Sequence, residues 1–152
     1  MKKTMVRLMA MLLAVLALCA FVGCGKTQDV KGSCTVVVGE SPEKVYKVPL
    51  DGLVVDKGLM SVMDYLKEKE GLSYTSNDTG YGAYLTSVGA LKENAAESTY
   101  MYIYTSVEKD FDVSAMATTK DYKGTTLTSA GVGATSMTVE DGAIFYISTI
   151  KY

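Results

Sequence analysis

The sequence predicts an α+β fold, a mainly antiparallel sheet with one helix, over residues 34–152. Three observations predict it. Segments rich in β-branched and aromatic residues recur with a period of two, one segment repeats its apolar positions at helical spacing, and Gly, Asn, Asp and Ser separate the segments. With 152 residues, 48% of them hydrophobic and 21% charged, the composition suits a single globular domain.

The first 23 residues predict a secretory signal peptide. They contain Lys2, Lys3 and Arg7 but no acid, and an apolar run extends from Leu8 to Val22. A membrane-spanning helix needs roughly 20 apolar residues, and this run has 15. Residues 24–33 are small, polar and without a pattern, so we expect a short tether there.

The end of the signal, Phe21-Val22-Gly23-Cys24, resembles the lipobox of bacterial lipoproteins. In that family a small residue precedes a cysteine that is lipidated and becomes the mature N-terminus. The resemblance implies that Cys24 carries acyl chains such as palmitate. Two or more such chains anchor a protein stably where one does not. We therefore expect a lipid-anchored protein on the extracytoplasmic side of the cell membrane.

The segments Cys34–Val38 and Val45–Leu50 predict a β-hairpin. Both are β-branched, and the six residues between them are rich in turn formers. Cys34 has no intramolecular partner once Cys19 leaves with the signal and Cys24 is lipidated, so we expect it to be a small buried hydrophobic residue. A reactive or intermolecular thiol is the alternative.

One helix is predicted between Lys57 and Gly71. Its apolar positions are spaced i, i+3, i+4 and i+7, which places them on one face. Asp56 or Ser61 is available to cap its start, and Gly71 is expected to end it. The apolar positions are Leu59, Val62, Met63 and Leu66.

Four later segments predict strands, because they are aromatic and β-branched and are bounded by turn residues. They are Leu72–Thr75, Tyr81–Val88, Tyr100–Val107 and Ala143–Lys151. The stretch Ser114–Thr138 differs, since 17 of its 25 residues are Ser, Ala, Thr or Gly. We expect a long loop there, with no more than one short strand.

The sequence lacks the residues of the common catalytic and metal sites. It has no histidine, which excludes His-centred triads and His-ligated metals. Ser41-x-x-Lys44 has the serine–lysine spacing of penicillin-recognising acyl enzymes, but it lies in a predicted turn and not at the start of a helix. Gly131–Ser136 matches only part of a glycine-rich phosphate-binding loop. Asn77–Gly80 and Asp110–Asp112 are expected to be ordinary turns and not calcium sites. We expect neither an enzyme nor a resident metal or cofactor.

Nucleic acid is excluded as a partner on charge. Removing the three basic residues of the signal from the chain's 15 leaves 12 against 17 acids, a net charge of −5 for residues 24–152. Binding to nucleic acid phosphates requires clustered Lys and Arg.

Tyrosine is the candidate recognition residue, because all 11 tyrosines lie in residues 24–152, against two phenylalanines. Strand alternation places Tyr100, Tyr102 and Tyr104 on one face. Two interpretations stay open: the rings half-cover the outer face of a sheet without any ligand, or they form a stacking surface for a flat or sugar-like ligand or for a protein. The candidate binding residues are Tyr81, Tyr84, Tyr100, Tyr102 and Tyr104.

The order of these segments resembles the transcobalamin-like C-terminal domain over most of residues 34–152. The resemblance rests on the hairpin, the helix and the stretches Tyr81–Gly89, Tyr100–Tyr104 and Val139–Tyr146. It implies a β-grasp-like α+β domain of the kind found in bacterial envelope lipoproteins and as the smaller cobalamin-contacting domain of vitamin B12 carriers. Cobalamin is therefore a ligand that the resemblance implies, and in those carriers a large helical domain supplies the other half of the site.

Together these features predict a lipid-anchored cell-envelope protein whose non-enzymatic domain binds a ligand or partner, with a link to uptake of cobalamin or another nutrient. The alternative from a different class is a structural or adhesive module that binds other envelope proteins.

Overall fold

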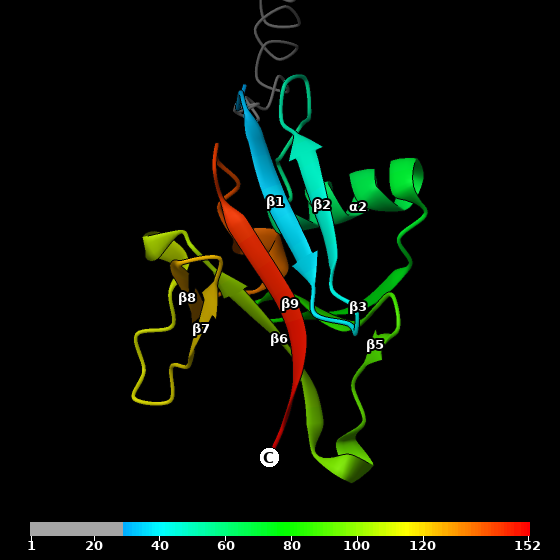
Figure 1. Cartoon of the computed structure of the whole chain (residues 1–152), viewed down its shortest axis with the longest axis vertical. Coiled ribbons are helices and arrows are strands. Elements are labelled where there is room, and N and C mark those ends of the chain that lie inside the picture. Colours follow the sequence, from blue (N-terminus) through cyan, green and yellow to red (C-terminus); the bar gives the residue numbers. More distant parts are fainter. Residues whose placement is uncertain (1–28) are drawn as a thin grey trace, which may run out of the picture.

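The computed structural model describes residues 29–152, so the expected signal peptide, the start of the tether and Cys24 lie outside the described residues. This part of the chain contains nine strands in two sheets, one α-helix and three short 3-10 helices (Figure 1). No helix among residues 29–152 is long and apolar enough to cross a membrane. The predicted α+β class with a single helix is confirmed.

The larger sheet has six strands in the order β2-β1-β9-β6-β8-β7. Most neighbours are antiparallel, as predicted, but β1 and β9 run parallel with Val36 opposite Phe145. The first and last strands of the described chain therefore lie side by side at the centre of this sheet. Its strands are β1 (Ser33–Val38), β2 (Lys44–Pro49), β6 (Thr99–Thr105), β7 (Thr119–Tyr122), β8 (Thr125–Ser129) and β9 (Ile144–Lys151).

The smaller sheet is a separate antiparallel unit of three strands, β3 (Tyr74–Thr79), β4 (Gly82–Val88) and β5 (Leu91–Lys92). The register of β3 against β4 shifts between Thr75 and Ser76. The sequence pattern predicted β4 and the start of β3, but not β5 or the separation of these strands from the larger sheet. The expectation of a turn over Asn77–Gly80 was wrong for its first three residues, which extend β3 up to the turn at Gly80. Sheet membership depends on pairing between distant segments, which local alternation does not specify.

The predicted hairpin and helix are both present. β1 pairs antiparallel with β2, and the Ser41-x-x-Lys44 spacing lies in the connection up to the start of β2. Helix α2 (Leu59–Glu70) buries the four predicted apolar positions and ends at Gly71, whose φ is 68° and whose N–H bonds to the Leu66 carbonyl. Its start differs from the prediction.

Gly58 is the N-cap residue of α2, and no side chain caps the helix there. A Cβ on Gly58 would lie 2.5 Å from the Met137 carbonyl oxygen, so glycine allows the 3-10 helix η3 (Ala134–Ser136) and the residue after it to approach the helix closely. Ser61 accepts a hydrogen bond from the Lys57 N–H at 3.1 Å, within the turn that precedes the helix. Close packing at the N-cap explains why neither Asp56 nor Ser61 caps the helix as expected.

The prediction of a long loop over Ser114–Thr138 was wrong. This stretch contains the antiparallel hairpin β7–β8 and the 3-10 helix η3 (Ala134–Ser136). Lys123 and Gly124, with φ of 48° and 85°, form the two-residue turn that a right-twisted hairpin favours. The two strands consist mostly of Thr, Ser and Lys. Their only large apolar side chains are Tyr122 and Leu127, which are too few to show the alternation of apolar and polar residues that indicates a strand.

Two clusters of buried side chains pack on opposite faces of the larger sheet. The main core lies between this sheet, helix α2 and the smaller sheet, and includes Phe145, Ile147 and Leu66. Cys34 belongs to it with 1% exposure, and burial raises the pKa of its thiol to about 11, as expected for a small buried residue. The second cluster, which we call the tyrosine cluster, consists of Val37, Tyr104, Tyr122, Leu127 and Tyr146.

Candidate functional site

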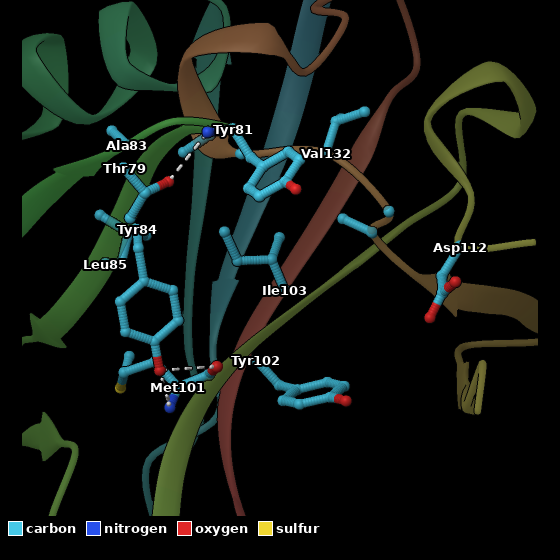
Figure 2. A pocket seen from close by; sticks show the side chains of 14 residues that line it. Thr79, Tyr81, Ala83, Tyr84, Leu85, Met101, Tyr102, Ile103, Asp112 and Val132 are labelled. Carbon is cyan, nitrogen blue, oxygen red and sulfur yellow. Dashed lines mark hydrogen bonds between the residues drawn. The ribbon is translucent and has the colours of Figure 1, made fainter. Parts of the chain in front are cut away.

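A groove of about 500 Å³ separates β4 of the smaller sheet from β6 of the larger one (Figure 2). This volume is in the range of pockets that take small-molecule ligands. Apolar and aromatic side chains form most of its walls. The lining residues are Thr79, Tyr81, Ala83, Tyr84, Leu85, Met101, Tyr102, Ile103, Asp112 and the segment 130–134.

The groove exists because β6 lacks a neighbouring strand along its first half. On one side β6 pairs with β9 over its whole length, whereas on the other side β8 pairs only with Tyr104 and Thr105. Backbone groups of the remaining residues must therefore find other partners. Ile103 O accepts the Ala130 N–H at 2.8 Å, and Met101 is satisfied by a side chain of β4.

Tyr84 takes the place of the missing strand at Met101. Its hydroxyl accepts a hydrogen bond from the Met101 N–H at 3.2 Å and lies 3.5 Å from the Met101 carbonyl oxygen, to which it donates. Burial raises the pKa of Tyr84, so the phenol stays protonated and able to donate. With its hydroxyl bound to the backbone, Tyr84 contributes a fixed ring to the groove wall.

Tyr81 is the most exposed aromatic residue of the groove, at 88%, and lies in the β3–β4 turn. Its carbonyl oxygen accepts the Gly133 N–H at 3.1 Å, which holds this turn against segment 130–134. A Cβ on Gly133 would lie 2.4 Å from that oxygen, so the close approach requires glycine. Figure 2 shows the Tyr81 ring between Tyr84 and Val132, above Ile103.

Tyr102 and Asp112 lie toward the other side of the groove (Figure 2). The Tyr102 hydroxyl is 2.9 Å from that of Tyr152, and this hydrogen bond together with burial raises the pKa of Tyr102 to about 12. One carboxylate oxygen of Asp112 accepts the Ser114 N–H at 2.8 Å. Asp112 is the only acid among the lining residues, and they include no lysine or arginine.

The structure separates the five candidate tyrosines into two groups. Tyr81, Tyr84 and Tyr102 line the groove, whereas Tyr100 and Tyr104 do not. Tyr100 packs against Tyr152 with ring centroids 6.0 Å apart. Tyr104 is 6% exposed and belongs to the tyrosine cluster, close to the β7–β8 hairpin. The predicted alternation along β6 is present, but the five rings do not form one continuous surface.

Sequence reasoning missed Asp112 and segment 130–134 as parts of this site. In the sequence, the glycines of this segment resemble only part of a phosphate-binding loop, and Asp112 lies with Asp110 in a predicted turn. Gly131 and Gly133 were a signal of close backbone approach, since a Cβ on Gly131 would lie 2.9 Å from the Asp112 Cα. Nothing local in the sequence indicated that β4 would be their neighbour.

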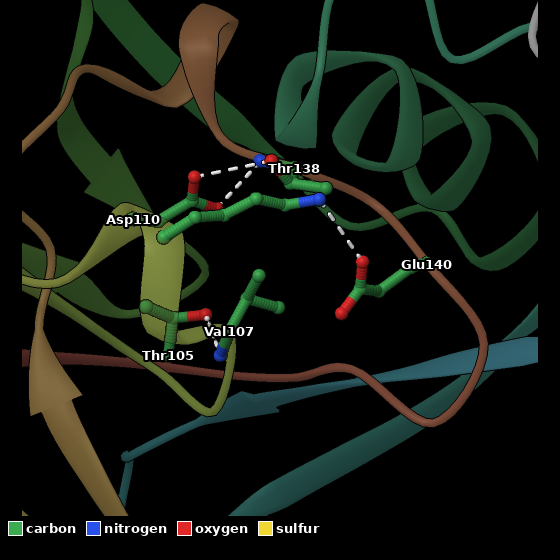
Figure 3. Close-up of polar contacts among 6 residues, drawn as sticks. Thr105, Val107, Asp110, Thr138 and Glu140 are labelled. Atoms are coloured by element: carbon green, nitrogen blue, oxygen red, sulfur yellow. Dashed lines mark hydrogen bonds and ion pairs between the residues drawn. The ribbon is translucent and has the colours of Figure 1, made fainter.

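Asp110 and its surroundings support the fold (Figure 3). The buried carboxylate accepts hydrogen bonds from the Thr138 N–H at 2.6 Å and the Thr138 hydroxyl at 3.1 Å. Lys109 pairs with Glu140 at 3.2 Å on the surface. Among residues 29–152, no three His, Cys, Asp or Glu side chains gather as metal ligands would. Lys44 of the Ser41-x-x-Lys44 motif forms an ion pair with Glu40 at 2.8 Å, so its ammonium group is already engaged within the turn.

No family model and no curated protein matches this sequence. Solved structures do match. A "putative metal binding protein" from Ruminococcus gnavus ATCC 29149 has a TM-score of 0.53 at 19% identity, with 80% of this chain and 99% of that chain covered. Haptocorrin in complex with Cbi has a TM-score of 0.57 at 18% identity, with 82% of this chain but only 26% of that chain covered. The described domain therefore has the transcobalamin-like α+β fold that the sequence predicted.

Proposed function

We propose that this domain is a non-enzymatic binding module that takes a small molecule into the groove between β4 and β6. The observation that supports this most directly is the exposed ring of Tyr81 beside a preformed, mainly apolar cavity of about 500 Å³. An exposed aromatic ring beside apolar walls loses little conformational freedom on binding and offers a large contact area.

The chemistry of the groove favours binding over catalysis. Its lining includes one carboxylate and neither a lysine nor a cysteine, so the residues that line it offer no nucleophile paired with a base. The hydroxyl of Thr79 is already bonded to the Gly82 carbonyl at 2.5 Å. Tyr84 is bonded to the backbone in the same way, so these polar groups fix the shape of the groove.

The structural neighbours suggest ligand classes to test. Haptocorrin is solved with Cbi and the Ruminococcus protein is described as metal-binding. A single carboxylate in the groove is a poor set of ligands for a metal ion. Cobalamin therefore remains the first candidate from the fold resemblance, followed by other flat or sugar-like nutrients.

Native mass spectrometry tests this function directly. The purified protein is incubated with cobalamin, haem or glycans, and retention of a ligand is compared with that of Tyr81→Ala. We expect the wild type to retain one class of molecule and the variant to lose it, because the substitution removes the exposed ring of the groove. Retention of no small molecule by the wild type would favour the structural or adhesive alternative.

The export part of the proposal concerns Cys24. We propose that lipid on this cysteine holds the domain on the extracytoplasmic side of the membrane, where a nutrient-binding module meets its ligand. Cys24→Ala should abolish palmitate labelling and leave the precursor uncleaved. Recovery of unprocessed, soluble wild-type precursor from the cytosol would contradict the anchor without affecting the groove.

A further inference from the structure

The charge of the groove allows the ligand class to be narrowed. Of its 14 lining residues, Asp112 is the one acid and none is a lysine or arginine. An anionic ligand would therefore meet a carboxylate and no opposite charge, which is unfavourable in a half-enclosed site. The protein around the groove is also acidic, with a net charge of −5 over residues 24–152, which attracts cations at long range.

Asp112 retains acceptor capacity that its contacts in the protein do not use. An ionised carboxylate has about four acceptor sites on its two oxygens. Only the Oδ1 atom bonds within the described chain, to the Ser114 N–H at 2.8 Å. The backbone fixes this residue, since Asp112 N–H donates to the Ser129 carbonyl at 2.8 Å. The second oxygen makes no hydrogen bond within residues 29–152, and it belongs to a residue that lines the groove.

The aromatic walls add to this preference. Tyr81 and Tyr84 line the cavity, and aromatic rings attract cations and stack on flat groups. Tyr102 also lines it, but its ring packs on the tyrosine cluster, with its centroid 5.9 Å from that of Tyr104. The protein uses the same contact elsewhere, where Lys120 Nζ lies 4.4 Å from the Tyr146 ring centroid. A cavity of about 500 Å³ is in the range that accommodates one small molecule.

We propose that the groove selects a small molecule with a flat apolar body and a single positive charge, such as an aromatic amine. The body lies between Tyr81, Tyr84 and Ile103, and the ammonium group lies beside Asp112. This inference rests on the proposed binding function and specifies the charge of its ligand. It differs from a general aromatic site because it makes opposite predictions for cationic and anionic versions of the same ring.

Three indole probes test the proposal: tryptamine, 3-methylindole and indole-3-acetate, which are cationic, neutral and anionic at pH 7.5. The protein has no tryptophan, so the indole fluorescence anisotropy reports on the probe alone. We expect tryptamine to bind most tightly and indole-3-acetate least tightly. Asp112→Asn should weaken tryptamine about five-fold, the ratio expected for one partly exposed charge pair, and leave 3-methylindole unchanged.

Asp112→Asn is a mild substitution because its Oδ1 atom can still accept from Ser114. The matched control is Asp121→Asn, which removes the same charge from β7 outside the groove and keeps an acceptor for the Thr126 hydroxyl. We expect this control to change tryptamine affinity less than two-fold. An effect as large as that of Asp112→Asn would show a general charge effect and overturn the proposal.

The remaining outcomes separate this inference from the proposed function. Equal binding of all three probes, with loss in Tyr81→Ala, would keep the groove as a binding site and overturn the selection for a cation. Tighter binding of indole-3-acetate would overturn it as well. Absence of binding by every probe would overturn the inference about a cationic aromatic ligand, and the proposed function would then depend on the test with cobalamin, haem and glycans.

Discussion

Tyrosines pack against both faces of strand β6, but the two faces differ in how far the rest of the chain covers them. On one face Tyr104 packs with Tyr146, Tyr122 and Leu127, and the β7–β8 hairpin supplies two of these side chains. On the other face Met101 and Ile103 line the groove with Tyr84. The chain covers Tyr104 with its own hairpin, whereas on the second face Met101 is buried in the main core and only Ile103 stays partly exposed at the groove. Tyrosine content alone therefore does not identify a binding surface.

The polar tips of the tyrosines show the same contrast. The Tyr84 hydroxyl at the groove makes both of its hydrogen bonds with the Met101 backbone. The Tyr122 hydroxyl in the tyrosine cluster is buried with no partner in the described structure. The first ring is placed by its hydroxyl and the second by the packing of its apolar body. Substitutions that remove one contribution at a time can separate these roles.

The largest effect is expected from Leu127→Ala in the tyrosine cluster. Leu127 is fully buried among the side chains of this cluster, so the substitution should lower the free energy of unfolding by about 2–5 kcal/mol through lost contacts and a residual cavity. Urea denaturation measures this change. The groove counterpart is Val132→Ala, whose partly exposed side chain predicts a change within about 0.5 kcal/mol. Equal effects would contradict the distinction between a covered face and an open one.

Tyr84→Phe should have the next largest effect. It removes the one group that satisfies the Met101 N–H and carbonyl on the unpaired side of β6. Leaving partly buried backbone groups without partners should cost about 1–3 kcal/mol of unfolding free energy. Hydrogen exchange at the Met101 amide, measured beside the urea midpoint, distinguishes this local cause. An unchanged exchange rate would indicate that water replaces the hydroxyl and that Tyr84 does not hold the groove.

Tyr122→Phe should leave the protein as stable as the wild type or more stable, by up to about 1 kcal/mol. The substitution removes a buried hydroxyl that has no hydrogen-bond partner and keeps the ring that packs edge-on against Tyr146. The urea midpoint is measured for this variant as for Tyr84→Phe. The two variants form a matched pair because each removes one tyrosine hydroxyl and keeps the ring. A loss as large as that of Tyr84→Phe would mean that the Tyr122 hydroxyl has a partner, such as a bound water.

The elements predicted correctly are those with a local cause. The hairpin and helix could be predicted because their signals depend on neighbours within a few residues. These signals are the β-branched run Cys34–Val38, the helical spacing from Leu59 to Leu66 and the left-handed Gly71. The β7–β8 hairpin also had a local signal, the Lys123-Gly124 turn. It was missed because its apolar residues were too sparse to define strands.

The groove could be predicted only in part, because its geometry arises from contacts between distant segments. Tyr84 and Met101 are 17 residues apart, and the Ala83 N–H bonds to the Thr135 hydroxyl across 52 residues. The sequence indicated tyrosines as recognition residues and placed Tyr102 and Tyr104 on one face. It did not indicate that a hairpin would lie against Tyr104, or that Asp112 would lie at the groove.

The smallest effect concerns Tyr102, at the groove and bonded to the C-terminal Tyr152. Its pKa is raised from 10.0 to about 12 in the folded protein by that hydrogen bond and by burial. The folded state therefore holds this proton more tightly than the unfolded state, so the stabilisation is complete below pH 10 and is lost as the pH rises toward 12. Tyr102→Phe removes the titrating group, and its urea midpoint should fall less than that of the wild type between pH 9 and 11. A parallel decline of the urea midpoint in both proteins would show that other tyrosines with a raised pKa account for the loss of stability at alkaline pH. Tyr146 of the tyrosine cluster, which is beside Glu43, is one such residue.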